Sequence, residues 1–293
     1  MVVCAHGYSG NARDFDDLAR GLAPHARVIC LDFPGRGESD WLASPLEYHF
    51  GQFLADAGAL LAHLQVRRVQ WIGTSMGGLL GMLLAARPMS PVGRLVMNDV
   101  GAFVPLDALQ AIVHRLETPA RFASIEDVEA HVRASHRDWG ELGARQWRRL
   151  ALHGARKDGD GWRLHYDPRI TRLLRPFPPG LGLFFWDAWY RVACPVLVLR
   201  GERSEVLPAE VARTMLAVKP SARFAEIAGC GHAPALMARD QVALVRNFVV
   251  EAMDKGPWRK PRSSSFPGSS RIPTFSRLRS RGSSSRGPAP SPI

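Results

Sequence analysis

Short apolar runs alternate with longer segments in which apolar side chains recur every three or four positions. The short runs predict buried β-strands, and the periodic segments predict amphipathic helices. Strands are expected at residues 1–5, 27–33, 68–72, 93–99, 194–200 and 222–227, and helices at residues 14–22, 48–64, 79–86, 210–218 and 242–253. This alternation favours an α/β fold with a mostly parallel sheet covered on both faces.

The alternation stops between residues 102 and 191. No buried-strand run occurs there, and the periodicity predicts helices at residues 106–116, 125–137 and 144–153. We interpret this segment as a helical cap inserted into a core of residues 1–101 and 192–255. Because the first strand begins at Met1, we also expect the N-terminal edge strands of the sheet to be missing from this sequence.

The formal net charge of +11 is concentrated at the C-terminal end. Residues 256–293 hold eight Lys or Arg and no Asp or Glu, so residues 1–255 carry only +3 (11 − 8). This Ser-, Arg- and Pro-rich tail has too few apolar residues to fold alone and is predicted to be disordered. Its arginines suit phosphate binding, but Phe266 and Phe275 stand alone among them and give no interleaved aromatic pattern for base stacking. We expect a solvated appendage with no nucleic-acid partner.

The chain shows no sign of a metal site or of a membrane segment. Its four cysteines lack Cys-x-x-Cys or metal-ligand spacing, and three lie in or beside apolar runs, so buried free thiols are expected. No signal-peptide pattern opens the chain, and no apolar run reaches the ~18 residues that a membrane span needs. These features predict a cytoplasmic protein.

The sequence Gly73-Thr74-Ser75-Met76-Gly77 lies between a predicted strand and a predicted helix. A strand, a sharp turn and a helix with a serine at the tip is the arrangement of a nucleophile elbow. Glycines are needed because larger side chains at such a turn collide with the neighbouring strand and helix. The helix also aims its backbone N–H groups and its positive end at the group that the serine attacks.

A nucleophilic serine needs a base that takes its proton, an acid that orients the base, and donors for the oxyanion. Gly231-His232 supplies a histidine on the loop between the last predicted strand and the last predicted helix. The flanking glycines allow this loop to carry the imidazole towards Ser75. His232 is therefore the predicted base.

Several motifs together resemble the α/β-hydrolase superfamily, in particular capped serine hydrolases similar to meta-cleavage-product hydrolases and related carboxylesterases. In chain order they are His6-Gly7, Asp32-x-Pro34-Gly35-x-Gly37-x-Ser39, Gly73-Thr-Ser-Met-Gly77-Gly78, Arg200-Gly201 and Gly231-His232. The resemblance implies an oxyanion hole formed by the backbone N–H groups of Tyr8 and Met76.

The acid has two candidates. The position at which most members of the superfamily place it, after the strand that follows the cap, holds Ser204 in this chain. Glu205 is one residue late and one methylene longer, which leaves it as the alternative acid. Asp99 ends the strand after the elbow, where some relatives place the acid and where such a sheet gathers its site. We favour Asp99.

The predicted function is a serine hydrolase that cleaves a small or medium carboxylic ester through an acyl-enzyme, with no cofactor. A C–C bond hydrolase of ring-cleavage products shares the same motifs, and a non-catalytic ligand-binding protein is a third possibility. A cap normally lines the acyl pocket, so one or two of Trp139, Trp186 and Trp189 are expected to contact substrate. A monomer and a homodimer are both compatible with the sequence.

Overall fold

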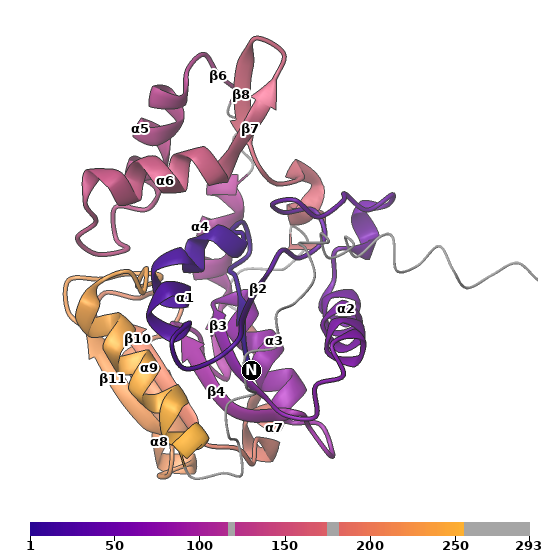
Figure 1. The fold of residues 1–293 in the computed structure, drawn as a ribbon, viewed down its shortest axis with the longest axis vertical. Helices are drawn as coiled ribbons and strands as arrows, with labels where there is room; N and C mark the ends of the chain where they lie inside the picture. Colours follow the sequence, from indigo (N-terminus) through magenta and orange to yellow (C-terminus); the bar gives the residue numbers. More distant parts are fainter. Residues whose placement is uncertain (117–120, 175–181, 255–293) are drawn as a thin grey trace, which may run out of the picture.

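A parallel sheet of six strands forms the centre of the computed structural model, which describes residues 1–116, 121–174 and 182–254 (Figure 1). The strand order is β11-β10-β4-β3-β1-β2, and every neighbouring pair is parallel. The strands are β1 (Val2–Ala5), β2 (Val28–Leu31), β3 (Val69–Thr74), β4 (Val92–Asn98), β10 (Val196–Gly201) and β11 (Arg223–Ile227). The prediction of a mostly parallel α/β sheet is confirmed.

Helices cover both faces of this sheet because successive side chains of its strands point to opposite sides. Val2 and Cys4 of β1 pack against α1 (Asp16–Leu22) and α9 (Arg239–Asp254) on one face. Val3 and Ala5 belong to the core of the other face, which contains α2 (Phe50–His63), α3 (Met76–Ala85) and α8 (Ala209–Val218). The four central strands β1, β3, β4 and β10 are therefore buried on both sides, which explains their hydrophobic runs, whereas the edge strand β11 is mostly exposed.

The segment between β4 and β10, which we call the inserted segment (residues 102–191), lies outside the central sheet. Its helices near residues 106–116, 125–137 and 144–153 were predicted, and α5, α6 and the β7–β8 hairpin project together at the top of Figure 1. Its elements are β5 (Phe103–Pro105), α4 (Leu106–Leu116), β6 (Arg121–Phe122), α5 (Ile125–Ser135), α6 (Ala144–Gly154), β7 (Ala155–Asp158), β8 (Gly161–Leu164), a 3₁₀ helix η3 (Pro168–Leu174), β9 (Gly182–Phe184) and α7 (Trp186–Arg191).

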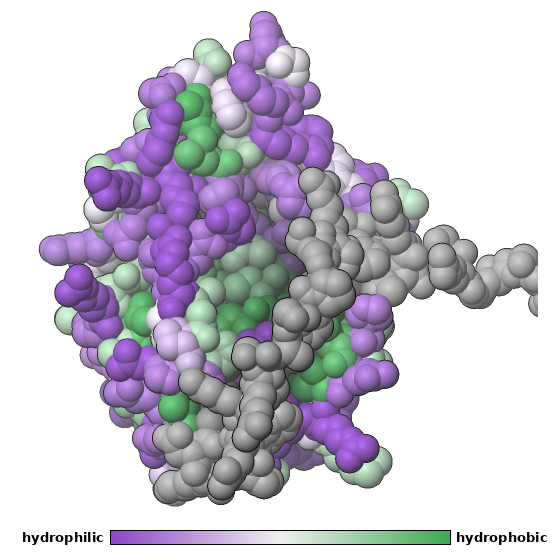
Figure 2. Space-filling model, viewed as in Figure 1, coloured by the Kyte–Doolittle hydropathy of each residue, from purple (hydrophilic) through white to green (hydrophobic). Residues whose placement is uncertain are grey.

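The inserted segment is not purely helical, which corrects the sequence-based description. Strands β6, β8 and β7 form an antiparallel sheet, and β5 pairs with β9. Strands β6, β7 and β8 carry charged residues and are mostly half-buried or exposed, and β5 and β9 have only three residues each, so none of them shows the apolar signature of a core strand. Hydrophilic residues dominate the outer face of this part of the molecule in Figure 2.

A separate apolar cluster stabilises the inserted segment and attaches it to the core. Val128 and Val132 of α5 pack against Trp147 and Leu150 of α6, and the same cluster includes Met237 of the loop before α9. This contact joins the inserted segment to the part of the core that follows β11.

The sequence also led to predictions about the cysteines, about membrane-spanning segments and about the C-terminal tail. All four cysteines are free, with Cys4 and Cys230 buried and Cys30 and Cys194 half-buried. Among the described residues, no helix has both the length and the apolar character needed to cross a membrane. The tail predicted for residues 256–293 lies outside the described residues.

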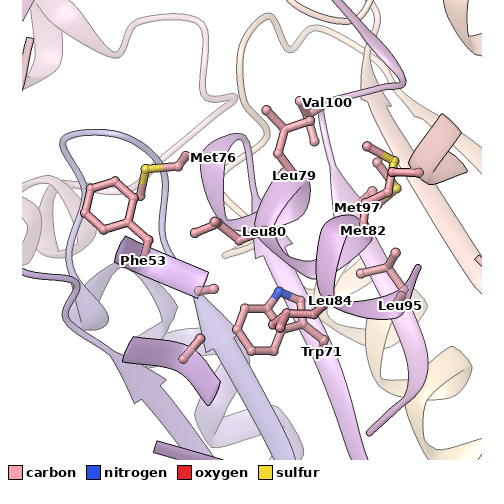
Figure 3. Packing of buried hydrophobic residues seen from close by; sticks show 14 of the residues in the cluster. Phe53, Trp71, Met76, Leu79, Leu80, Met82, Leu84, Leu95, Met97 and Val100 are labelled. Atoms are coloured by element: carbon pink, nitrogen blue, oxygen red, sulfur yellow. The ribbon is translucent and has the colours of Figure 1, made fainter. Parts of the chain in front are cut away.

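Helix α3 packs unusually close to the sheet. Nine of its ten residues are buried. The Trp71 ring of β3 lies against the helix (Figure 3), and its Nε1 donates to the Gly77 carbonyl at 2.9 Å. A Cβ at Gly81 would lie 2.3 Å from Trp71 Cδ1, so only glycine fits at that crossing. This packing fixes the first turn of α3 directly after the end of β3.

Candidate active site

Ser75 occupies a strained turn between β3 and α3. Its backbone has φ 52° and ψ −116°, a conformation that is costly for a residue with a side chain. The turn leaves no room beside it: a Cβ at Gly73 would lie 2.1 Å from the Gly77 carbonyl oxygen, and one at Gly77 would lie 2.0 Å from the Ala5 carbonyl oxygen. Side chains larger than glycine would therefore collide at these positions, as the Gly-x-Ser-x-Gly pattern predicts. The turn places the Ser75 hydroxyl at the carboxyl edge of the sheet.

Ser75, His232 and Asp99 form a chain of hydrogen bonds. His232 Nε2 lies 2.9 Å from Ser75 Oγ, and His232 Nδ1 lies 2.7 Å from Asp99 Oδ2. An ionised carboxylate only accepts hydrogen bonds, so Nδ1 carries the ring hydrogen and Nε2 is left to accept from the serine. The three side chains come from three separate elements of the core.

The loop between β11 and α9 carries His232, and it is held from both sides. The amide of Asn98 at the end of β4 donates to the Pro234 carbonyl at 2.9 Å. From the inserted segment, the Asp138 carbonyl accepts from the Gly231 N–H at 2.7 Å. The imidazole is therefore positioned by the core and by the inserted segment together.

Asp99 is fully buried immediately after β4. Its Oδ1 accepts from the Gly201 N–H at 2.7 Å, and its Oδ2 accepts from the Ser204 hydroxyl at 2.7 Å as well as from His232. Three donors balance the cost of burying this carboxylate. Glu205, the alternative acid, is exposed, and within the described residues it makes no hydrogen bond or ion pair.

Ser204 is a site residue whose contact the sequence analysis missed. It occupies the position where an acid was sought, and its side chain instead donates to Asp99 while accepting from the Leu207 N–H at 3.1 Å. The sequence held no direct signal for this contact, because it depends on the pairing of β4 with β10, which places a hydroxyl after β10 next to a carboxylate after β4.

The loop after β1 lies against Ser75. A Cβ at Gly7 would be 3.7 Å from Ser75 Cβ, so the backbone of this loop passes close to the hydroxyl. In the described part of the chain, neither the Tyr8 N–H nor the Met76 N–H donates to a protein acceptor. Both N–H groups are free for a ligand, as the oxyanion prediction requires, although their role stays a prediction.

A buried arginine holds this loop in place. Arg36 is fully buried, its Nε donates to the Tyr8 carbonyl at 2.8 Å, and its guanidinium lies 5.0 Å from the ring centres of both Tyr8 and Phe53. Burial lowers the pKa of Arg36 to about 10, so it stays cationic at neutral pH. Two backbone carbonyls and three aromatic rings thus replace the water around this cation.

Ser75 and His232 open into a pocket of about 170 Å³ between the core and the inserted segment. Trp139 lines this pocket, whereas Trp189 is buried in the core with its Nε1 donating to the Met215 carbonyl at 3.1 Å, and Trp186 packs against the same core. Only the first of the three tryptophans expected to contact substrate is therefore placed to do so. Side chains from α4 and α5 complete the wall.

Burial favours the neutral forms of three histidines and one aspartate in the pocket wall. Burial lowers the pKa of His6 to about 3 and that of His136 to about 4, and it also lowers the pKa of His131. Asp14 lines the pocket as well, and burial raises its pKa to about 7. Among the described residues, no group of His, Cys, Asp and Glu side chains is arranged to hold a metal ion.

The parallel sheet, the serine turn and the histidine loop define an α/β hydrolase. The sequence model of the alpha/beta hydrolase family matches residues 2–245, and the chain belongs to this family. The resemblance seen in the sequence motifs is confirmed.

Particular relatives point to ester hydrolysis. A 3-hydroxybutyrate-oligomer hydrolase of Cupriavidus necator is 37% identical over 262 residues, which cover 86% of this chain and 89% of that protein. A pimeloyl-[acyl-carrier protein] methyl ester esterase of Xanthomonas campestris is 27% identical over 86% of this chain and 95% of its own. A solved α/β hydrolase from Novosphingobium aromaticivorans has a TM-score of 0.77 and 34% identity, covering 85% of this chain and 88% of its own.

Proposed function

We propose that the protein is a serine hydrolase that cleaves carboxylic esters through an acyl-enzyme. The observation that carries this proposal is the unbroken chain from Ser75 Oγ to His232 Nε2 at 2.9 Å and from His232 Nδ1 to Asp99 Oδ2 at 2.7 Å. A buried acceptor on Nδ1 keeps Nε2 free to take the serine proton, which is the requirement for activating a hydroxyl near neutral pH.

The reaction takes place in two halves. Ser75 Oγ attacks the ester carbonyl while its proton passes to His232, and the developing oxyanion accepts hydrogen bonds from the Tyr8 and Met76 N–H groups. When the C–O bond of the ester breaks, His232 returns the proton to the leaving alcohol. A water molecule, deprotonated by His232, then attacks the acyl-enzyme, and His232 returns the proton to Ser75 Oγ as the acyl bond breaks and the acid leaves. Each oxyanion donor is worth on the order of 2.7–4 kcal/mol of transition-state stabilisation in sites of this kind.

The similarity to a characterised relative suggests which esters to test as substrates first. The 3-hydroxybutyrate-oligomer hydrolase covers nearly the whole folded part of this chain, so short esters of hydroxy acids are the first candidates. We propose that the inserted segment acts as a cap that determines the length of the acyl chain, because α4 and α5 supply one wall of the pocket.

Fluorophosphonate labelling tests the nucleophile. The wild-type protein should be labelled, Ser75→Ala should not, and Ser135→Ala, which removes another hydroxyl of the pocket wall, should keep the label. Hydrolysis of p-nitrophenyl acetate, butyrate and octanoate by the same proteins then measures chain-length preference. A folded but unlabelled wild-type protein would favour a non-catalytic ligand-binding role. Turnover of a vinylogous diketone with no turnover of any ester would favour a C–C bond hydrolase.

A further inference from the structure

Arg115 is a cation in the pocket that the proposed chemistry does not use. It lies near the end of α4, is exposed, and lines the same pocket as Ser75 and His232. Within residues 1–116, 121–174 and 182–254 it makes no ion pair and no hydrogen bond. The other Arg and Lys side chains of this part of the chain do not line the pocket.

Among the residues that the structure describes, the neighbours of Arg115 do not compensate its charge. His136, on the adjacent end of α5, is kept neutral by burial, and the charge of Arg115 itself lowers the pKa of His136 further. His131 has a lowered pKa for the same reason of burial. The one carboxyl group of the wall is Asp14, whose pKa of about 7 leaves it only partly ionised at neutral pH. Arg115 is thus the only permanent charge in the described pocket wall.

The end of α4 is also held in position. The Tyr166 hydroxyl, which lies in the same wall, donates to the Leu116 carbonyl at 3.3 Å. The Leu116 and Ile112 side chains flank Arg115 in the lining and are apolar. A guanidinium presented beside apolar surface is suited to a carboxylate, because its planar fork donates two parallel hydrogen bonds.

We propose that Arg115 binds a free carboxylate of the substrate, so that the pocket selects anionic esters over neutral esters of the same shape. This inference rests on the proposed ester hydrolysis and adds the charge of the substrate to it. Every linear oligomer of a hydroxy acid ends in a free carboxylate, so a short oligomer of this kind offers both an ester bond for Ser75 and an anion for Arg115.

Two matched substrates separate charge from shape. The first is the linear dimer of 3-hydroxybutyrate, which has one ester bond and one carboxylate. The second is the same dimer with its carboxylate replaced by a primary carboxamide, which is neutral and nearly isosteric. Consumption of each substrate by wild type, Arg115→Gln, Arg115→Lys and Arg145→Gln is followed by chromatography. Arg145 is an exposed arginine of α6 outside the pocket and serves as the control for net charge.

In wild type, kcat/KM should be about 10-fold higher for the dimer than for its amide, since a hydrogen-bonded charged group typically contributes this much. Arg115→Gln should remove this preference mainly through KM and leave the amide unchanged. Arg115→Lys should keep part of the preference, and Arg145→Gln should behave as wild type. The preference should also shrink as the salt concentration rises.

Equal rates for both substrates in wild type would overturn the role of Arg115, and so would an equal loss on both substrates in Arg115→Gln. Hydrolysis of p-nitrophenyl butyrate, measured in parallel, distinguishes the two levels of the argument. If that neutral ester is cleaved while the dimer is not preferred over its amide, only the carboxylate site fails. If no ester is cleaved, the proposed function fails and the inference with it.

Discussion

Replacing Asp99 by asparagine tests which carboxylate serves His232. Asp99 Oδ1 accepts from the Gly201 N–H, a backbone donor with no alternative role, and Oδ2 accepts from His232 Nδ1. In Asp99→Asn the amide oxygen must face Gly201, so the amide NH₂ faces the imidazole. The ring then accepts at Nδ1 and carries its hydrogen on Nε2, where it cannot take the proton of Ser75.

The expected loss is large because the geometry survives while the tautomer is wrong. The same substitution in a serine-protease triad lowers kcat about 10⁴-fold. At about 1.36 kcal/mol per tenfold change in rate, this corresponds to about 5 kcal/mol of transition-state stabilisation. The folded structure should tolerate the change, since asparagine fills the same volume and keeps the contact with Gly201.

The assay is kcat for p-nitrophenyl butyrate, with thermal unfolding as a check on folding. Glu205→Gln is the matched control, since this exposed side chain makes no hydrogen bond or ion pair within the described residues and its loss should leave kcat unchanged. If Asp99→Asn keeps more than about a tenth of wild-type kcat, the tautomer argument is refuted. If Glu205→Gln is instead the inactive variant, the alternative acid is the right one.

Three further substitutions test the packing and the electrostatics of the fold. Gly77→Ala should prevent the elbow from forming, because its Cβ would lie 2.0 Å from the Ala5 carbonyl oxygen, whereas Gly58→Ala, which meets open space in α2, should raise stability by about 1 kcal/mol. Thermal unfolding of the two variants measures the predicted loss of stability in Gly77→Ala and the predicted gain in Gly58→Ala. A native-like melting temperature for Gly77→Ala would contradict the packing argument. Asp14→Asn should change how stability depends on pH: burial raises the pKa of Asp14 from 3.8 to about 7, so the folded state resists its ionisation and stability falls as pH rises from about 4 to 7. The variant should lose this decline, which amounts to at most ~1.36 kcal/mol per pKa unit before solvent screening. Urea unfolding at several pH values would count against this reasoning if wild type and Asp14→Asn kept the same slope.

The core of the fold was predictable because its central strands are buried on both faces and most of its helices have one buried face. The predicted strand at residues 68–72 is β3 (Val69–Thr74), and the predicted helix at residues 210–218 is α8 (Ala209–Val218). The short strands of the inserted segment were not predictable from apolar pattern. Strand β7, for example, presents Arg156 and Lys157, whose cations lie over the rings of Trp41 and Trp162 at 4.5 Å. Pairing of this kind depends on tertiary contacts that a hydrophobic pattern does not record.

For the site, the motifs led to Ser75 and His232, and the structure brings both together with Asp99. Sequence spacing alone left Asp99 and Glu205 open, because the choice depends on the lateral register of β4 against β10, in which Asn98 pairs with Leu199. The residues of the pocket wall were even harder to predict from the sequence. Arg115 is a solvated helix charge by its sequence pattern and becomes a pocket residue only through the packing of α4 over the core.

The proposed nucleophile and its acid both belong to one strand–helix–strand unit, residues 69–99. Ser75 follows β3, Asp99 follows β4, and the Ser75 N–H donates to the Asn98 carbonyl at 2.9 Å, so the two turns are tied directly to each other. The inserted segment begins only after this unit is complete. Its sequence and length are therefore free to diverge, and with them the range of substrates, without moving the attacking oxygen relative to the buried charge. Under the proposed function, reactivity and selectivity would be encoded in separate stretches of the chain, and the loop of His232 is the part of the site that contacts both the core and the inserted segment.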